Sequence, residues 1–305
     1  MMVCASCGKS EAGDIKLKNC NACYLVKYCS IKCQKEHRRQ HKRACKKRAA
    51  ELRDEILFKQ PESSHFGDCP ICCLPLSLDQ SKSSLYSCCS KLICIGCALA
   101  NHKLQDKEEE IRNSCPFCRQ PVSSTQKEAD RNTMKRIEVN DPVALRQWGY
   151  RRYSEGDHKS AFEYWTRAAK LGDASAHYEL SHSYQEGTGG VEKNEKLEMY
   201  HLEQAAIGGH PSARNNLGCA EGKNRRHDRA MKHLIIAANL GYDNSLKLLR
   251  TFHAEGIVSK EDLASALRGH QAAVDATKSP QREAAEVYRN GSLLKGEGAW
   301  LRVNK

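Results

Sequence analysis

Cysteines three or four positions apart dominate the first 118 residues of the chain, and such pairs are typical ligands of zinc. Of the chain's 17 cysteines, seven lie between residues 4 and 45 and nine between residues 69 and 118. Two intervening residues let a tight turn present both thiolates to one tetrahedral ion, whereas a separation of four positions places both ligands on one helix face. The chemistry to expect is therefore structural metal binding in two separate modules. The remaining cysteine, Cys219, is expected to pack within a helix.

The first module provides eight candidate ligands in four pairs. They are Cys4 with Cys7, Cys20 with Cys23, Cys29 with Cys33, and His41 with Cys45. The segment that follows Ser30 contains neither Pro nor Gly as far as residue 56, and it predicts a helix with Ser30 as its N-cap. Because apolar residues are sparse along this helix, we expect metal rather than an apolar core to hold it in place.

The text YCSIKCQKEHRRQHKRAC at residues 28–45 resembles the second half of MYND-type zinc fingers. The resemblance covers residues 4–45 and implies two interleaved zinc sites. One would be formed by Cys4, Cys7, Cys29 and Cys33, and the other by Cys20, Cys23, His41 and Cys45. Members of this family generally dock short proline-containing peptides, but Arg38 stands here where many of them carry an aromatic residue. The spacing also leaves His37 as an alternative ligand to His41.

The second module contains three CxxC pairs, which supply six of the eight ligands that two zinc ions require. These pairs are Cys69 with Cys72, Cys94 with Cys97, and Cys115 with Cys118. A fourth pair must come from the segment between the first two, where Cys88 and Cys89 are adjacent. Adjacent cysteines can share one metal, so we expect both to be ligands. Cys73, His102 and an incompletely ligated site are the alternatives.

The order of these pairs, with CPIC at one end and CPFCR at the other, resembles the RING finger. The resemblance implies a cross-brace with two zinc ions, which makes four zinc ions in total for the two fingers. One ion would be bound by Cys69, Cys72, Cys94 and Cys97, and the other by Cys88, Cys89, Cys115 and Cys118. Lys91 stands where the sequence pattern of the RING family has a histidine. An ammonium group is not a zinc ligand, so another residue must supply that donor.

A RING finger performs no covalent chemistry itself but holds a charged ubiquitin-conjugating enzyme in a reactive geometry. The resemblance implies this partner-binding role for Ile71 between the first two ligands, Pro116 after the seventh and Arg119 after the eighth. Each of the three has a purely structural alternative, namely packing around zinc or a solvated charge. No catalytic residue is expected within the chain, and the module is a candidate RING-type ubiquitin ligase.

From residue 141 onward the chain repeats itself at a helical-repeat period. AAKLGDASAHYEL, AAIGGHPSARNNLG and AANLGYDNSLKLL align on Ala169, Ala206 and Ala238, which gives periods of 37 and 32 residues. Periods in this range indicate stacked helix pairs, in which small residues allow close packing and glycine ends one helix before the next. The segment resembles Sel-one-like repeats, relatives of the tetratricopeptide repeat, and such solenoids bind other proteins on a concave surface.

The expected core and surface of this solenoid can be stated by residue. The expected core positions are Trp165, Leu180, Tyr184, Leu202, Leu217, Leu234 and Ile235. The histidines spread over the repeats are expected to be surface residues rather than a metal site. They are His158, His177, His182, His201 and His210.

Charge and hydropathy exclude some classes of protein and leave others open. Residues 1–60 hold 15 Lys/Arg and 6 Asp/Glu, which gives +9 of the chain's net +12. The basic tract RRQHKRACKKR permits binding to nucleic acid or nuclear import, although no aromatic residues interleave with it and a solvated helix face is the simpler interpretation. No apolar run is long enough to span a membrane, and the N-terminus lacks a secretory pattern. We therefore expect a cytoplasmic or nuclear protein.

The sequence thus predicts a multi-domain protein, with two small zinc-stabilised cross-brace fingers followed by an all-α helical-repeat solenoid. The expected segments are a MYND-type finger at 1–48, a linker at 49–66, a RING-like finger at 67–122, a linker at 123–140, Sel-one-like repeats at 141–280, and a C-terminal cap and loose tail at 281–305. The favoured function is zinc-dependent protein binding with ubiquitin ligase activity, the solenoid selecting the target. A non-catalytic adaptor is the alternative, and a nucleic-acid-linked regulator is a third hypothesis.

Overall fold

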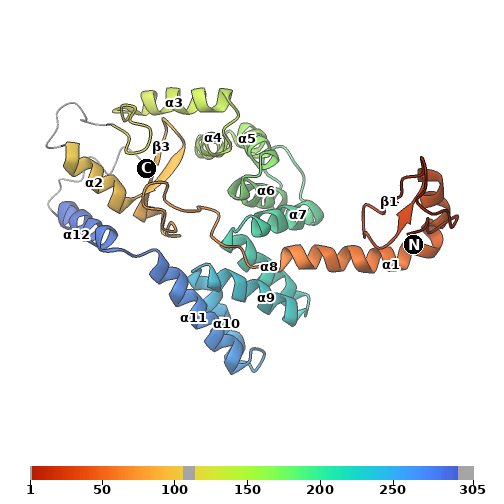
Figure 1. Cartoon of the computed structure of the whole chain (residues 1–305). Coiled ribbons are helices and arrows are strands. Elements are labelled where there is room, and N and C mark those ends of the chain that lie inside the picture. The colour runs from red at the N-terminus through yellow and green to blue at the C-terminus, as the bar shows by residue number, and fades with distance from the viewer. Residues whose placement is uncertain (1, 106–113, 295–305) are drawn as a thin grey trace. The chain divides into compact units, whose positions relative to one another are not determined.

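The computed structural model describes residues 2–105 and 114–294 (Figure 1). The chain divides into two compact units, Met1–Lys59 and Gln60–Lys305. Among the described helices, none is both long enough and apolar enough to cross a membrane.

The first unit is a small finger followed by one long helix. Strands β1 (Lys18–Asn19) and β2 (Lys27–Tyr28) pair antiparallel, and helix α1 (Ile31–Leu57) follows directly. The side chain of Ser30 accepts a hydrogen bond from the Cys33 amide, which is the N-cap that the sequence predicts. The finger's buried cluster is made mostly of cysteine. Its members are Cys4, Leu17, Cys20, Cys23, Tyr28 and Cys33.

The second unit begins with a β-hairpin and a helix that resemble the centre of a cross-brace finger. A short 3₁₀ turn η1 (Gln80–Lys82) leads into β3 (Ser83–Tyr86), which pairs antiparallel with β4 (Lys91–Cys94) before helix α2 (Ile95–Gln105). Two isolated bridges, Asp68 with Pro75 and Ser114 with Pro121, close the loops that carry the outer CxxC pairs. The hairpin and these loops share one buried cluster, in which Ile93 is fully buried.

The rest of the second unit is helical and forms the solenoid (Figure 1). Its helices are α3 (Gln126–Glu138), α4 (Pro142–Ser154), α5 (His158–Lys170), α6 (Ala174–Glu186), α7 (Glu195–Ile207), α8 (Pro211–Lys223), α9 (His227–Asn239), α10 (Asp243–Ala254) and α11 (Lys260–Ala276). The N-cap side chains of Asp141, Asp173 and His210 begin the first helix of successive pairs. The loop between α6 and α7 is longer than the loop between α8 and α9, which explains the unequal periods.

The expected core positions of the solenoid are nearly all buried. Trp165, Leu180, Leu202, Leu217 and Leu234 are each at most 3% exposed. Tyr184 and Ile235 are only half-buried, and Ile236, one residue further, is buried instead of Ile235. Ile235 and Ile236 are adjacent in the sequence, and a 3.6-residue period does not determine which of two adjacent apolar side chains faces the core.

The last described helix, α12 (Pro280–Leu294), does not extend the solenoid stack. It packs against α2 of the hairpin module, where Ile95, Leu99 and Ala285 form a small buried cluster. The segment expected to be a cap and loose tail therefore includes a helix that supports the finger. Residues 295–305 of that tail lie outside the described residues.

Candidate metal centres and protein-binding cavity

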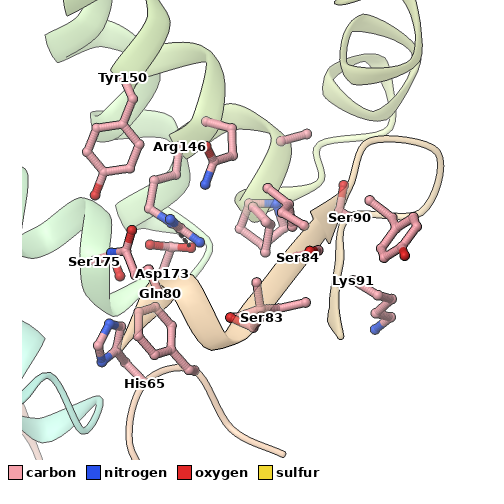
Figure 2. Close-up of a pocket in the computed structure, with 18 of the residues that line it drawn as sticks. His65, Gln80, Ser83, Ser84, Ser90, Lys91, Arg146, Tyr150, Asp173 and Ser175 are labelled. Atoms are coloured by element: carbon pink, nitrogen blue, oxygen red, sulfur yellow. Dashed lines mark hydrogen bonds and ion pairs between the residues drawn. The ribbon is translucent and has the colours of Figure 1, made fainter. Parts of the chain in front are cut away.

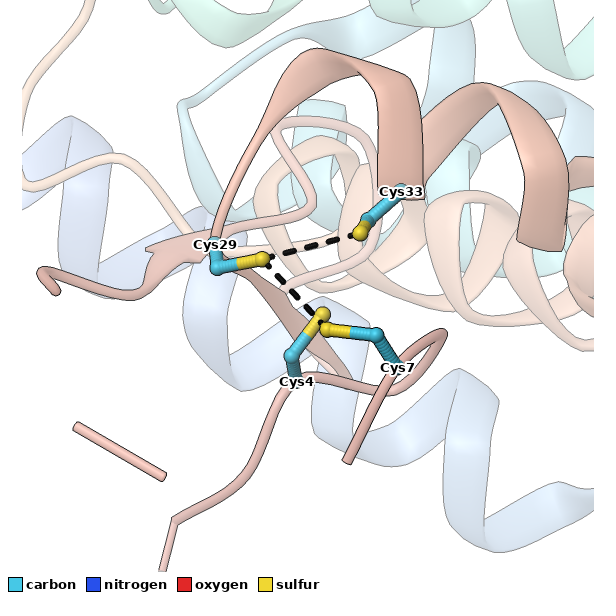
Figure 3. A group of neighbouring side chains, drawn as sticks. All are labelled: Cys4, Cys7, Cys29 and Cys33. Atoms are coloured by element: carbon cyan, nitrogen blue, oxygen red, sulfur yellow. Dashed lines mark hydrogen bonds between the residues drawn. The ribbon is translucent and has the colours of Figure 1, made fainter. Parts of the chain in front are cut away.

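The first finger brings its eight predicted ligands together as two interleaved groups. The ligand atoms of Cys4, Cys7, Cys29 and Cys33 lie within 4.8 Å of one another (Figure 3), and so do those of Cys20, Cys23, His41 and Cys45. In the first group the Cys29 sulfur is 3.6 Å from the sulfurs of both Cys7 and Cys33. In the second, His41 Nε2 is 3.2 Å from the Cys23 sulfur.

His37, the alternative to His41, lies outside both groups. Its Nδ1 is 3.0 Å from the hydroxyl of Tyr28, and its ring stacks on that of His41 at 5.7 Å between centroids. Cys33, His41 and Cys45 are the helical ligands, and His37 contributes to packing around them.

A left-handed residue follows the second cysteine in five of the turns that present ligands, whereas Cys97 continues into α2. The residues with positive φ at this position are Gly8, Tyr24, Cys73, Ser90 and Arg119. In the CxxC turns the carbonyl of the first cysteine accepts a hydrogen bond from the amide of this left-handed residue, as for Tyr24, Cys73 and Arg119. Cys73 is thus the residue that closes a turn, is exposed, and belongs to no ligand group.

The same turn geometry explains how adjacent cysteines can serve one metal. The carbonyl of Tyr86 accepts the amides of both Cys89 and Ser90, so Tyr86 occupies the backbone position that the first cysteine has in a CxxC turn. Cys89 is then the second ligand of the turn, and Cys88 supplies the thiol that Tyr86 lacks. The Cys88 sulfur is 3.4 Å from that of Cys118, and the Cys89 sulfur is 3.8 Å from that of Cys115.

The second finger therefore also forms two four-sulfur groups. They are Cys69, Cys72, Cys94 and Cys97, and Cys88, Cys89, Cys115 and Cys118, each with its sulfurs within 4.8 Å of one another. His102 belongs to neither group. Lys91 also stands apart, with its Nζ over the ring of Phe117 at 5.8 Å from the centroid.

The residues present fit zinc. Zn–S bonds of about 2.3 Å at tetrahedral angles separate neighbouring sulfurs by about 3.8 Å, close to the sulfur separations seen here. The pKa of Cys69 is lowered to about 4, chiefly by the hydrogen bond from the Cys94 thiol, and the pKa of Cys115 is lowered to about 5, chiefly by that from Cys88. Thiolates are the form that binds metal. The chain binds zinc, these four groups are its candidate sites, and zinc there would supply the cross-links that the small cores of the fingers lack.

The three predicted partner-binding residues lie on the outer loops of the second finger. Ile71 is 42% exposed, Pro116 is half-buried and Arg119 is exposed. Phe117 was not predicted, but it lies between two of them in the sequence and is 43% exposed. An apolar residue between two cysteine ligands is a signal that could have identified Phe117, since Ile71 has the same position in its own loop.

A large cavity lies in the second unit between the hairpin and the solenoid (Figure 2). Its volume is about 1970 Å³, and residues 83–88 form one wall while α4 and α6 supply the opposite wall. On the helical wall, Arg146 Nε donates to Asp173 at 3.1 Å, and the Tyr150 hydroxyl donates to Glu179 at 2.8 Å. This cavity could not be predicted from the sequence, because its walls come from segments far apart in the chain.

Burial shifts the pKa values of several residues that line the cavity. Burial raises the pKa of Glu179 and also that of Tyr150, and it lowers the pKa of His65 to about 3. His210 stacks on His65 and on Tyr178, and its pKa is also lowered by burial. His210 is only 7% exposed, so its expected position on the surface is wrong: its side chain caps α8 by accepting from the Ala213 amide.

The opposite wall is the edge of a strand. β3 has β4 as its partner on one side, and within the described ranges no other strand pairs with it. Ser83 and Ser84 of this strand line the cavity (Figure 2). An unpaired strand edge presents backbone donors and acceptors that another extended segment can pair with.

Eight exposed cations, six of them from the basic tract, form one face of α1. They are Lys32, Lys35, Arg38, Arg39, Lys42, Arg43, Lys46 and Lys47. At 100° per residue they cover the half of the helix that faces away from Cys33, His41 and Cys45. The zinc ligands and the positive charge therefore use opposite faces of one helix.

Comparison with known proteins agrees with this architecture. Residues 4–45 match the MYND finger, and residues 142–173, 174–210 and 211–242 each match the Sel1 repeat. The chain thus carries a MYND finger followed by three Sel1 repeats, as predicted, while the RING-like finger between them rests on its cysteine groups. The comparison with curated proteins gave no match.

Two solved structures resemble part of the chain. A Sel1 repeat protein from Oxalobacter formigenes is 29% identical over 51% of this chain and 66% of its own, with a TM-score of 0.44. A protective antigen of uropathogenic Escherichia coli that displays an SLR fold is 21% identical over 49% of this chain and 34% of its own, with a TM-score of 0.41. The chain therefore spans just under two thirds of the first protein and about a third of the second.

Proposed function

We propose that this modular zinc-binding protein is an adaptor that binds an extended segment of a partner protein in the cavity between β3 and the solenoid. The observation that carries the proposal is that β3, a strand with one unpaired edge among the described residues, and a helical-repeat wall line the same cavity. Main-chain hydrogen bonds to a strand edge supply affinity for any extended peptide, and side-chain contacts supply specificity. The cavity supplies both kinds of contact.

The charged side chains of the cavity indicate which kind of partner segment would bind there. Arg146 is paired with Asp173, whereas Glu179 has a tyrosine hydroxyl as its described hydrogen-bond partner. A half-buried carboxylate next to a neutral hydroxyl favours a cationic donor, because a charge-assisted hydrogen bond is stronger than a neutral one. The segment proposed to bind is therefore extended and carries a Lys or Arg that reaches Glu179.

The first prediction concerns this cavity. Peptides selected from a random library on the full-length protein are expected to slow amide hydrogen exchange at residues 83–86, because they pair with the edge of β3. Glu179→Gln is expected to weaken their binding about tenfold through loss of the charged acceptor. Glu163→Gln, a matched change of an exposed glutamate on α5, should leave binding unchanged. Peptides that bind without protecting residues 83–86 would show that the strand edge is not the site.

A second function, ubiquitin ligase activity, is supported by the exposure of the second finger's outer loops. α12 covers the side of α2 that contains Ile95 and Leu99. Asn101, two residues beyond Leu99, lies on the other side of the helix and donates to the Ser114 carbonyl, next to the loop that carries Pro116. Ile71 is 42% exposed with α12 packed on α2, and the face bearing it is therefore proposed to remain open to a ubiquitin-conjugating enzyme.

The second prediction tests this activity. In an autoubiquitination assay with a panel of conjugating enzymes, wild type is expected to form conjugates. Ile71→Ala and Arg119→Ala are expected to reduce their rate at least about tenfold, because each removes a proposed contact to the enzyme. Ile56→Ala, which removes a similarly exposed isoleucine from α1, serves as the matched control. Absence of conjugates with every enzyme would leave the adaptor function alone.

A further inference from the structure

We propose that Arg282 is a positioning residue for the zinc site formed by Cys69, Cys72, Cys94 and Cys97, and that this contact couples metal binding to docking of α12. Arg282 lies in the first turn of α12 and is only 6% exposed. It lies more than 180 residues from the nearest ligand in the sequence, yet its guanidinium reaches the ligand loop directly. The inference depends on the zinc site and is independent of the proposed function.

The contacts of Arg282 are directed at one ligand and its loop. Nη2 donates to the Cys72 sulfur at 3.2 Å and to the Leu74 carbonyl at 3.0 Å. Nη1 donates to the Pro75 carbonyl at 2.6 Å and to the Thr277 carbonyl at 2.8 Å. One side chain therefore contacts a metal ligand, the loop that follows this ligand and the end of α11, just before its own helix.

The charge of the site explains why an arginine belongs there. Four thiolates and one Zn²⁺ carry a net charge of −2, and a buried anion of this size requires compensating donors. A guanidinium hydrogen bond to a coordinated thiolate offsets part of this charge and fixes the ligand's orientation. In the other four-sulfur group of this finger, the described side-chain contacts of the sulfurs run between its own cysteines, and backbone amides such as that of Lys91 also donate to it.

The backbone of α12 is also fitted to the finger. Gly96 lies between Cys94 and Cys97, and a Cβ on it would meet the Cα and backbone nitrogen of Arg282 at 3.1 Å. The Gly96 carbonyl accepts from Gln281 Nε2 at 3.2 Å. This close approach requires the turn around Cys94 and Cys97 to be formed, which zinc accomplishes. By linkage, metal binding favours docking of α12, and docking of α12 favours metal retention.

The third prediction tests this coupling with the full-length protein. Arg282→Gln is expected to speed the chelator-driven loss of one zinc about tenfold or more, since outer contacts to metal ligands typically change affinity by about 10 to 100-fold. Arg282→Lys should restore part of the retention, because an ammonium keeps the charge but has fewer donors. Arg289→Gln is the matched control, since Arg289 contacts the Ser81 carbonyl and no sulfur.

Two further measurements distinguish positioning of the ligand from general loosening of the helix. With ¹¹³Cd in place of zinc, Arg282→Gln should shift one cadmium resonance and Arg289→Gln none, because only the first change removes a donor to a coordinated sulfur. Removing metal from wild type should raise amide exchange in α12 and leave α4 to α9 protected. Equal zinc-loss rates and equal cadmium spectra for the two variants would overturn the proposal, as would an α12 whose exchange does not respond to metal.

Discussion

Replacing Cys69 by serine is expected to release one zinc and to unfold the second finger while the solenoid stays folded. Cys69 is fully buried and belongs to a cluster in which cysteines outnumber the other apolar side chains. Structural zinc contributes about 10 to 16 kcal/mol of folding free energy in finger peptides, far more than so small a core can replace. The solenoid has its own buried clusters, so its helices do not depend on this metal.

This fourth prediction is checked by amide exchange and by zinc content. Protection should be lost across β3 and β4 and retained across α4 to α9. Cys219→Ser is the matched control, because Cys219 lies on α8 and belongs to no ligand group. Its effect on the free energy of unfolding is expected to stay within about 1 kcal/mol. A Cys69→Ser protein that keeps a protected hairpin would mean that the finger's fold does not need the metal.

Replacing Gly149 by alanine is expected to destabilise the solenoid by about 2 to 3 kcal/mol, although alanine is the better helix former. A Cβ at Gly149 would lie 2.4 Å from Nε1 and 2.5 Å from Cδ1 of the Trp165 ring. Trp165 is 3% exposed and packs against Tyr150 and Tyr153, so the rigid indole has little room to move. The backbone of α4 must therefore shift away from α5.

The control for this fifth prediction is the same substitution on another helix. At Gly222 of α8, the nearest atom to an added Cβ is the Ala230 Cβ at 4.0 Å, an ordinary contact. Gly222→Ala should therefore stabilise the protein by about 0.5 to 1 kcal/mol through helix propensity. The two variants should move the thermal midpoint of the helical signal in opposite directions. If both were stabilising, the close approach of α4 and α5 at Trp165 would not be a constraint.

The sequence was a good guide where chemistry and spacing are local. Ligands three or four positions apart can be paired from the sequence, because a turn or a helix face determines their geometry. The repeat alignment on Ala169, Ala206 and Ala238 likewise located the stacked helices, since small buried residues recur at each close contact. The choice of both Cys88 and Cys89 also followed from elimination, although its cause, a turn begun by the carbonyl of Tyr86, became visible only in the backbone hydrogen bonds.

Features that depend on long-range packing could not be predicted. Nothing in the sequence near Arg282 indicates a contact with Cys72, because their separation along the chain carries no periodic signal. The cavity combines a strand edge with a helical wall more than 50 residues later. His210 shows the same limit: a histidine before a helix looks exposed, yet the chain around Ser63 and His65 approaches Gly209 closely and covers it.

We propose that four complete zinc sites organise the two fingers, and native mass spectrometry of the full-length protein tests this proposal most directly. The four ligand groups predict a mass increment of four zinc ions for wild type, and of three for Cys88→Ser. Wild type with three ions, and the same number in Cys88→Ser, would contradict the account, because the turn at Tyr86 would then present no second thiol to the metal.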